Sequence, residues 1–221
     1  MLNKYLIIDF DSTIVKVETL DELAKVALEG NEKKDEIVRK IVETTNLGME
    51  GKITFPESLE RRIKLISTHR DTVDEVSKYF LDQITDSVLK NLDFFRENND
   101  RIYIISGGFC ELIAPVAELM GIKRENILAN NFVFDEKGFL CGVDTENLMA
   151  KDRGKINQIK SLNLDKKAFM IGDGWTDCET KECEEIERFI AFTENIHRDN
   201  VVENADVVAE SFDEVIEISS K

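Results

Sequence analysis

The sequence is poor in the residues that build covalent frameworks and histidine-dependent sites. Only two of the 221 residues are histidines, His69 and His197, and only four are cysteines. The cysteines show no C-x-x-C spacing, so reduced thiols are favoured over a disulfide framework or a zinc site. The shortage of histidine argues equally against a histidine-based metal site or a Ser/His catalytic pair.

Positive charge is also scarce. There are 29 Lys and Arg residues against 45 Asp and Glu residues, which gives a net charge of −16. This balance disfavours nucleic acid or an anionic membrane as a partner, since both need clustered positive charge. It also repels anionic substrates at long range, so a phosphate site would need a metal or a few well-placed cations.

Long apolar runs are absent as well. No stretch approaches the length of a membrane span, and the N-terminal residues show no cleavage-site pattern, so we expect a cytoplasmic protein. With 42% hydrophobic residues, the chain can bury a core as one domain with an insertion or as two small domains.

Short apolar runs alternate with helical patterns along most of the chain. We predict strands at 5–8, 101–106, 127–130, 168–171, 189–192 and 206–208, a hairpin at 132–143, and helices at 86–98, 109–120, 154–162 and 212–218. This order is typical of an α/β fold, a Rossmann-like parallel sheet with helices on both faces.

Residues 15–84 differ from the rest because they carry helical patterns and no strand signal. We predict helices at 20–27, 35–45, 56–67 and 72–84, with residues 48–52 as a loop. The predicted organisation is an α/β core of residues 1–14 and 85–221, with a helical cap, residues 15–84, inserted after the first strand. A cap in that position is well placed to act as a lid.

The stretch Tyr5–Glu18 organises the chain. Its apolar run stops abruptly at Asp9, and Asp11 follows two residues later. If the backbone stays extended, both carboxylates leave the same side of it. Two such charges repel each other unless a cation lies between them, so the pair indicates a divalent metal or a proton-transfer role. An Asx-rich loop after a strand is the simpler alternative.

Two further polar clusters follow predicted strands, at Ser106-Gly107-Gly108 and at Gly172-Asp173-Gly174-Trp175-Thr176-Asp177. Ligand sites of parallel sheets lie beyond the carboxyl ends of the strands, so the three clusters should meet. Trp175 either forms a wall of the site or simply packs.

Taken together, these motifs resemble the haloacid dehalogenase superfamily, and within it the phosphoserine phosphatases. The resemblance implies that Asp9 attacks phosphorus to give an aspartyl-phosphate, while Asp11 protonates the leaving oxygen and then activates water. It also implies Mg²⁺ held by Asp9, the Asp11 carbonyl and Asp173, with Asp177 in support. Ser106 and Gly107 would hold the phosphate.

The third family motif is a lysine that pairs with phosphoryl oxygens, and two residues compete for it. The turn Asp152-Arg153-Gly154-Lys155 places Arg153 where lysine is usual, with Lys155 two residues on. Lys155 is slightly favoured, because a compact ammonium suits the role of a point charge. Both assignments stay open, and either side chain could be ordinary surface charge.

The resemblance assigns substrate recognition to the predicted cap. It implies Glu18 for the substrate ammonium, Arg62 for its carboxylate, and Met49 and Phe55 as apolar walls, with Thr176 as a further contact. Helical spacing supports Arg62 independently, since it follows Phe55 and Leu59 on one helical face. The alternative is that Arg61 and Arg62 are both exposed cations.

The leading hypothesis is therefore a Mg²⁺-dependent phosphoserine phosphatase with a place in L-serine biosynthesis. It implies a small phosphorylated metabolite as partner, with O-phosphoserine as the first candidate, and neither nucleic acid nor a membrane. A second hypothesis keeps the chemistry for another small phosphomonoester or for transfer to an acceptor alcohol. A third is a non-catalytic module that accepts phosphate on aspartate as a signal.

Overall fold

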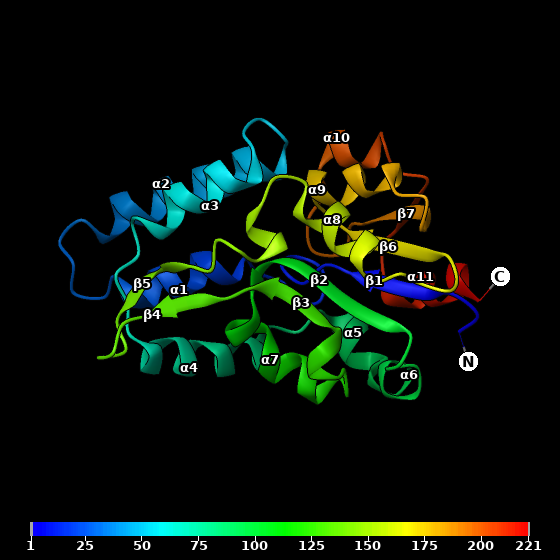
Figure 1. Ribbon diagram of the computed structural model, residues 1–221, viewed down its shortest axis with the longest axis horizontal. Coiled ribbons are helices and arrows are strands. Elements are labelled where there is room, and N and C mark those ends of the chain that lie inside the picture. Colours follow the sequence, from blue (N-terminus) through cyan, green and yellow to red (C-terminus); the bar gives the residue numbers. More distant parts are fainter. Residues whose placement is uncertain (1, 221) are drawn as a thin grey trace.

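The computed structural model describes residues 2–220. Its centre is a six-stranded sheet of order β3-β2-β1-β6-β7-β8, in which all neighbouring strands are parallel (Figure 1). The strands are β1 (Tyr5–Ile8), β2 (Ile102–Phe109), β3 (Ile127–Asn130), β6 (Ala168–Gly172), β7 (Ile186–Phe192) and β8 (Val207–Ala209). This confirms the predicted α/β fold.

Helices cover both faces of the sheet, because successive strand residues point to opposite sides and both sides are apolar. In β1, Leu6 and Ile8 pack in one buried cluster and Ile7 in the other. The first cluster includes residues of α5 (Asp86–Lys90), α6 (Leu92–Glu97), α7 (Cys110–Leu119) and α11 (Phe212–Ser219). The second includes residues of α8 (Gly154–Ser161), α9 (Trp175–Cys178) and α10 (Asp199–Val202).

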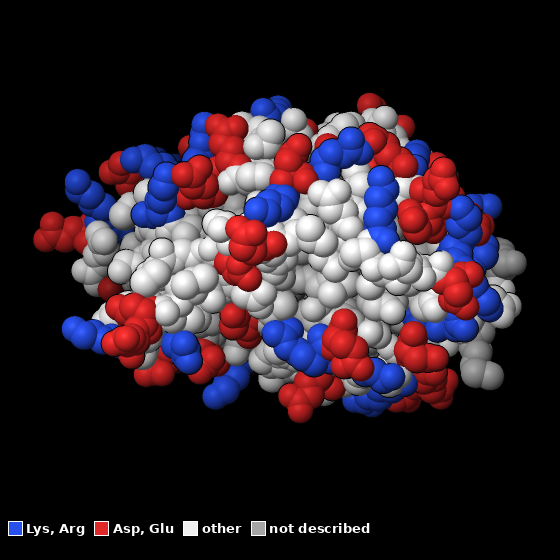
Figure 2. Space-filling model, viewed as in Figure 1, with Lys and Arg blue, Asp and Glu red and all other residues white. Residues whose placement is uncertain are grey.

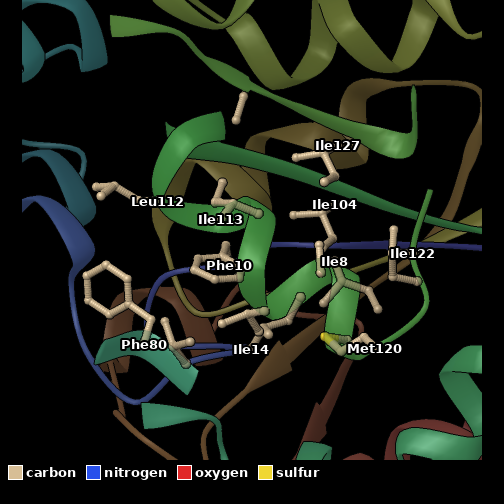
Figure 3. Close-up of a cluster of buried hydrophobic side chains, with 14 of the residues drawn as sticks. Ile8, Phe10, Ile14, Phe80, Ile104, Leu112, Ile113, Met120, Ile122 and Ile127 are labelled. Carbon is tan, nitrogen blue, oxygen red and sulfur yellow. The ribbon is translucent and has the colours of Figure 1, made fainter. Parts of the chain in front are cut away.

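The 15–84 segment forms the helices at the left of Figure 1. They are α1 (Thr19–Ala27), α2 (Lys34–Met49), α3 (Phe55–Ile63) and α4 (Arg70–Tyr79), followed by the 3-10 turn η1 (Phe80–Gln83). Helix α4 packs against α7, and α3 packs against α2. The cluster of buried side chains in Figure 3 joins Phe80 of this segment to Ile8 of β1 and to Phe10, which follows that strand.

A two-stranded hairpin, β4 (Phe132–Phe134) and β5 (Leu140–Val143), extends from the sheet toward these helices (Figure 1). Backbone hydrogen bonds connect it to the start of α4: the N–H of Leu140 donates to the carbonyl of Thr68, and the N–H of Arg70 donates to the carbonyl of Gly138, both at 2.9 Å. The hairpin therefore belongs by sequence to the predicted core and by contact also to the 15–84 segment.

Several predicted boundaries are wrong. Strand β2 continues through the Ser-Gly-Gly turn to Phe109, helix α2 continues through Gly48 to Met49, and α3 ends at Ile63. The helix expected at 86–98 is divided at Asn91, whose φ and ψ of −108° and 24° are not helical. Three further 3-10 turns are η2 (Arg124–Asn126), η3 (Leu148–Ala150) and η4 (Glu179–Glu182).

Charge on the surface is mixed. On the face drawn in Figure 2, Lys and Arg side chains alternate with Asp and Glu and form no continuous basic area.

Candidate active site

A cluster of buried carboxylates lies at the carboxyl ends of β1 and β6. Asp9 follows β1, and its N–H donates to the carbonyl of Ile171 in β6 at 2.9 Å. Asp173 follows β6, and Asp177 lies in α9. One carboxylate oxygen from each of the three aspartates lies within 4.8 Å of the others, and all three residues are buried. The predicted convergence of the first and fourth motifs is present.

Lys155 reaches this cluster from α8. Its Nζ lies 2.9 Å from Asp9 Oδ1 and 2.5 Å from Asp177 Oδ1, and its side chain is 6% exposed. Burial alone would lower the pKa of Lys155, but Asp177 and Asp9 outweigh burial and raise it. Burial and the neighbouring Asp9 raise the pKa of Asp177 to about 7, against the lowering effect of Lys155. Lys155 is therefore a charged cation between two carboxylates.

The competing residue, Arg153, lies outside the cluster. Its side chain is 46% exposed and forms an ion pair with Glu182. The structure thus brings Lys155 rather than Arg153 to the three aspartates.

A second cation, Arg198, whose side chain is 8% exposed, was missed by the sequence reasoning. Its Nε donates to Asp173 Oδ2 at 3.2 Å, and its Nη2 lies 3.6 Å from Glu18 Oε1. Arg198 follows β7, so it stands at the same edge of the sheet as the three motifs. A charged residue soon after a predicted strand was the signal that could have identified it.

The donor set suits a divalent metal. Three buried carboxylates converge, and burial followed by the charge of Glu18 raises the pKa of Asp173 well above its usual range. Carboxylates outnumber the cations that touch them, so a divalent ion bound by these oxygens would relieve their repulsion. The Asp11 carboxylate is not part of this three-residue cluster.

Asp11 is placed to carry a proton. It is buried, and its Oδ1 accepts a hydrogen bond from the N–H of Thr19 at 3.1 Å. Burial, then the charges of Glu18 and Asp9, raise the pKa of Asp11 well above its usual range. A carboxyl group in this environment holds its proton at a pH where an exposed aspartate would lose it.

The end of β2 forms another side of the site. The N–H of Gly108 donates to Ser106 Oγ at 3.0 Å, and Asn130 Nδ2 donates to the carbonyl of Gly107 at 2.9 Å. A Cβ on Gly107 would lie 2.5 Å from the ring of Phe55. Glycine is therefore required for the close approach of α3 to β2. Asn130 was not predicted from the sequence.

A small cavity is lined by part of this site and by residues of the 15–84 segment, whereas Asp173, Asp177 and Arg198 do not line it. Its volume is about 30 Å³, room for about two water molecules. The lining combines the predicted chemical and recognition residues, namely Asp9, Asp11, Glu18, Met49, Phe55, Arg62, Ser106, Gly107, Lys155 and Thr176. A larger cavity of about 310 Å³ adjoins it and shares Phe55, Gly107, Lys155 and Thr176.

Arg62 is buried, which contradicts the alternative that it is an exposed cation. It is 6% exposed, its Nε donates to the carbonyl of Ser58 at 3.3 Å, and its Nη1 donates to Thr45 Oγ1 at 3.3 Å. Thr45 in turn donates to Asp21 Oδ1 at 2.8 Å. Its neighbour Arg61 has the exposed position and pairs with Glu57. Helical spacing predicted this difference between adjacent arginines.

Glu18 lines the same cavity as Lys155. Its Oε1 accepts a hydrogen bond from Ser12 Oγ at 2.8 Å. Burial, then the charge of Asp21, raises the pKa of Glu18. Its second oxygen, Oε2, is buried without a hydrogen-bond partner among the described residues. An unpaired buried oxygen of this kind is suited to accept hydrogen bonds from a bound cationic group.

Comparisons with known proteins agree with these features. Residues 6–180 match the haloacid dehalogenase-like hydrolase family. The chain is 33% identical over 211 residues to the chloroplastic phosphoserine phosphatase of Arabidopsis thaliana, covering 94% of this chain and 69% of the relative. It is 32% identical to phosphoserine phosphatase of Mus musculus, covering 89% and 84%.

Among solved structures, a phosphoserine phosphohydrolase-like protein from Francisella tularensis superposes with a TM-score of 0.86 at 31% identity, covering 97% of this chain and 99% of that one. A substrate-bound phosphoserine phosphatase complex has a TM-score of 0.78 at 22% identity, and it supports the fold alone.

The comparisons leave the cellular compartment untested. Within residues 2–220, no helix is long and apolar enough to cross a membrane. One relative is a chloroplast protein, so similarity to these phosphatases does not assign a compartment. The expected cytoplasmic location stays a prediction.

Proposed function

Because the chain belongs to the haloacid dehalogenase-like hydrolases and is a phosphoserine phosphatase-like member, we propose that it converts O-phospho-L-serine and water to L-serine and phosphate. One observation carries this proposal. A single cavity joins Asp9 and Lys155, which suit phosphoryl chemistry, to Glu18 and Arg62, which suit the two charges of an amino acid. Family membership also favours hydrolysis over a phosphate-accepting signalling module.

The proposed chemistry has two steps at Asp9. In the first, an Asp9 carboxylate oxygen bonds to phosphorus as the bond to the serine oxygen breaks, and Asp11 gives that oxygen its proton. In the second, Asp11 takes a proton from water, the water oxygen bonds to phosphorus, and the bond to Asp9 breaks. The raised pKa of Asp11 suits the first role. Lys155, Ser106 and the Gly107 N–H stabilise the phosphoryl oxygens.

The proposed cofactor is Mg²⁺. The residues that would hold it are Asp9, the Asp11 carbonyl, Asp173 and, in support, Asp177, and oxygen donors are those that Mg²⁺ prefers. When bound, it supplies positive charge to the phosphoryl oxygens and so lowers their repulsion of the attacking carboxylate.

Substrate selection is proposed to depend on the 15–84 segment, acting as a cap. Glu18 would receive the substrate ammonium and Arg62 its carboxylate, with Met49 and Phe55 as apolar walls and Thr176 as a polar contact. A cavity of about 30 Å³ is too small to admit phosphoserine unless the cap moves. Closure then excludes water around the reacting groups.

The test is phosphate release from O-phospho-L-serine and from an aryl phosphate, each with and without Mg²⁺. We expect Mg²⁺-dependent release that Asp9→Asn abolishes. Glu18→Gln and Arg62→Ala should each lower kcat/KM for phosphoserine by about a hundredfold, because truncating one member of a buried charge pair costs about 2–5 kcal/mol. The aryl phosphate should change much less, because it lacks both charged groups.

Arg61→Ala is the matched control, since Arg61 is adjacent to Arg62 but exposed. It should leave both substrates unaffected. Equal losses for the two substrates in the Glu18 and Arg62 variants would refute the assigned selectivity. Adding alcohols and identifying the product would show whether transfer competes with hydrolysis.

A further inference from the structure

Trp175 is the only tryptophan in the sequence, and it lies against the loop between α2 and α3. A Cβ placed on Gly51 of that loop would lie 2.7 Å from Cδ1 and 2.8 Å from Cγ of the indole. On the core side, the indole and Glu179 line the same cavity, of about 310 Å³. Trp175 is therefore covered by the backbone of Gly51.

The same loop meets the core at each of its ends. A Cβ on Gly174 would lie 3.0 Å from Met49 Sδ, and a Cβ on Gly107 would lie 2.5 Å from the Phe55 ring. Next to Gly51, the carbonyl of Glu50 accepts a hydrogen bond from Asn200 Nδ2 at 3.2 Å. Figure 1 shows α2 and α3 meeting the core beside α9 and α10. The loop thus contacts the core at Glu50, at Gly51 and at the two residues that flank it.

We propose that Trp175 is a positioning residue, which acts through Gly51 to seat Met49 and Phe55 in the substrate cavity. Met49 and Phe55 flank the loop and line the cavity, whereas Trp175 does not line that cavity. Trp175 lines the adjoining cavity of about 310 Å³ instead, so we expect the indole to influence affinity for the amino-acid part of the substrate through the loop. This inference rests on the proposed function, because it assigns the cap residues to phosphoserine.

The contact is sensitive to a single methyl group. The atoms nearest to a Gly51 Cβ, Cγ and Cδ1, belong to the part of the indole closest to the backbone. They cannot move aside without moving the whole ring. A methyl group at residue 51 should therefore lift the loop rather than displace the indole.

Gly51→Ala tests this inference, and Gly30→Ala is its matched control. Both glycines have positive φ, +71° and +79°, so alanine is strained at both, but no atom lies within 4 Å of a Cβ on Gly30. We expect Gly51→Ala to raise KM for phosphoserine about tenfold, with kcat changed by less than about twofold, and Gly30→Ala to leave KM unchanged. Equal KM values in the two variants would overturn the proposal.

A double variant tests whether the effect passes through the indole. Trp175→Ala alone should raise KM, because the loop loses its support. Adding Gly51→Ala to it should cause no further rise, because the clash is gone. Independent, multiplicative increases in KM would show that Gly51 acts by another route and would overturn the proposal.

The fluorescence of Trp175 provides a readout that does not depend on turnover. With Asp9→Asn, which binds but should not hydrolyse, saturating phosphoserine should lower the acrylamide quenching constant about twofold. The same background with Gly51→Ala should show no such protection. Protection of equal size in both proteins would contradict the inference.

If the unmodified protein fails to hydrolyse phosphoserine, the proposed function fails. If it hydrolyses phosphoserine but Gly51→Ala behaves like Gly30→Ala, only the role of Trp175 fails.

Discussion

At the scale of single residues, the contrast between Lys155 and Arg153 is the most direct test of the phosphate site. Lys155 lies between Asp9 and Asp177, whereas Arg153 pairs with Glu182 at the surface. Lys155→Met should lower turnover by at least about a hundredfold, because the site loses its cation for the phosphoryl oxygens. It should also lower the free energy of unfolding by about 3–5 kcal/mol, because two buried carboxylates lose their partner.

Arg153→Met should cost no more than about twofold in turnover and about 1 kcal/mol in stability, since exposed ion pairs contribute little. Phosphate release and urea unfolding measure both quantities. If the Arg153 variant lost more turnover than the Lys155 variant, phosphate binding would have to be assigned to Arg153 instead.

The sequence predicted the position of a functional side chain where that residue lies in a short motif or follows a helical period. Asp9 and Asp173 come from motifs at strand ends, and the helical period distinguishes buried Arg62 from exposed Arg61. Arg198 and Asn130 were missed because each pairs with a residue far away in the sequence, and neither lies in a recognisable motif. A place at or after a predicted strand was the only sequence signal for either residue, and it does not say which residue would be the partner.

At the scale of elements, predicted strand and helix types hold and their ends do not. Gly48 was expected in a loop but lies within α2. A Cβ on Gly48 would lie 3.0 Å from Ser58 Oγ, so the lack of a side chain lets α3 approach α2. The Ser-Gly-Gly turn continues β2 because Phe109 still pairs with Asn130 after an irregularity in the register. Tertiary contacts thus override the local preferences of glycine.

The hairpin β4–β5 yields a test at this scale. Gly138 has a φ of +88°, and a Cβ there would lie 2.4 Å from His69 Nε2. Gly138→Ala should lower the free energy of unfolding by about 2–3 kcal/mol, through backbone strain and displacement of His69. Urea unfolding measures the loss, and Gly30→Ala isolates the strain, so it should cost only about 1 kcal/mol. Losses of the same size would mean that the contact with His69 contributes nothing.

At the scale of the whole molecule, the buried carboxylates link stability to pH and metal. The pKa of Asp177 rises from an ordinary 3.8 to about 7, and those of Asp11 and Asp173 rise as well. Between pH 3.8 and about pH 7 the folded state binds more protons than the unfolded state, so the free energy of unfolding falls as pH rises. The raised pKa of Lys155 stabilises the fold throughout this range, because the unfolded side chain loses its proton only at higher pH.

In chelator, we expect the free energy of unfolding to fall by about 2–4 kcal/mol between about pH 4 and about pH 7, since one pKa unit corresponds to about 1.4 kcal/mol. Millimolar Mg²⁺ should raise the midpoint of thermal unfolding more at about pH 8 than at about pH 5, because metal binding needs deprotonated ligands. Thermal and urea unfolding with and without Mg²⁺ measure both effects. Stability that is independent of pH in chelator would contradict the raised pKa values.

The uneven anchoring of the four helices in the 15–84 segment restricts how the active site can open. Helix α1 buries Leu20, Leu23 and Ala24 in the main apolar cluster, and α4 packs along α7 and is joined to the hairpin. Helix α2, although sixteen residues long, buries only Ile41 and Thr45. Swinging the entire segment outward would expose most of that apolar surface to water. We therefore expect α2 and α3, rather than the entire segment, to move when the cavity opens.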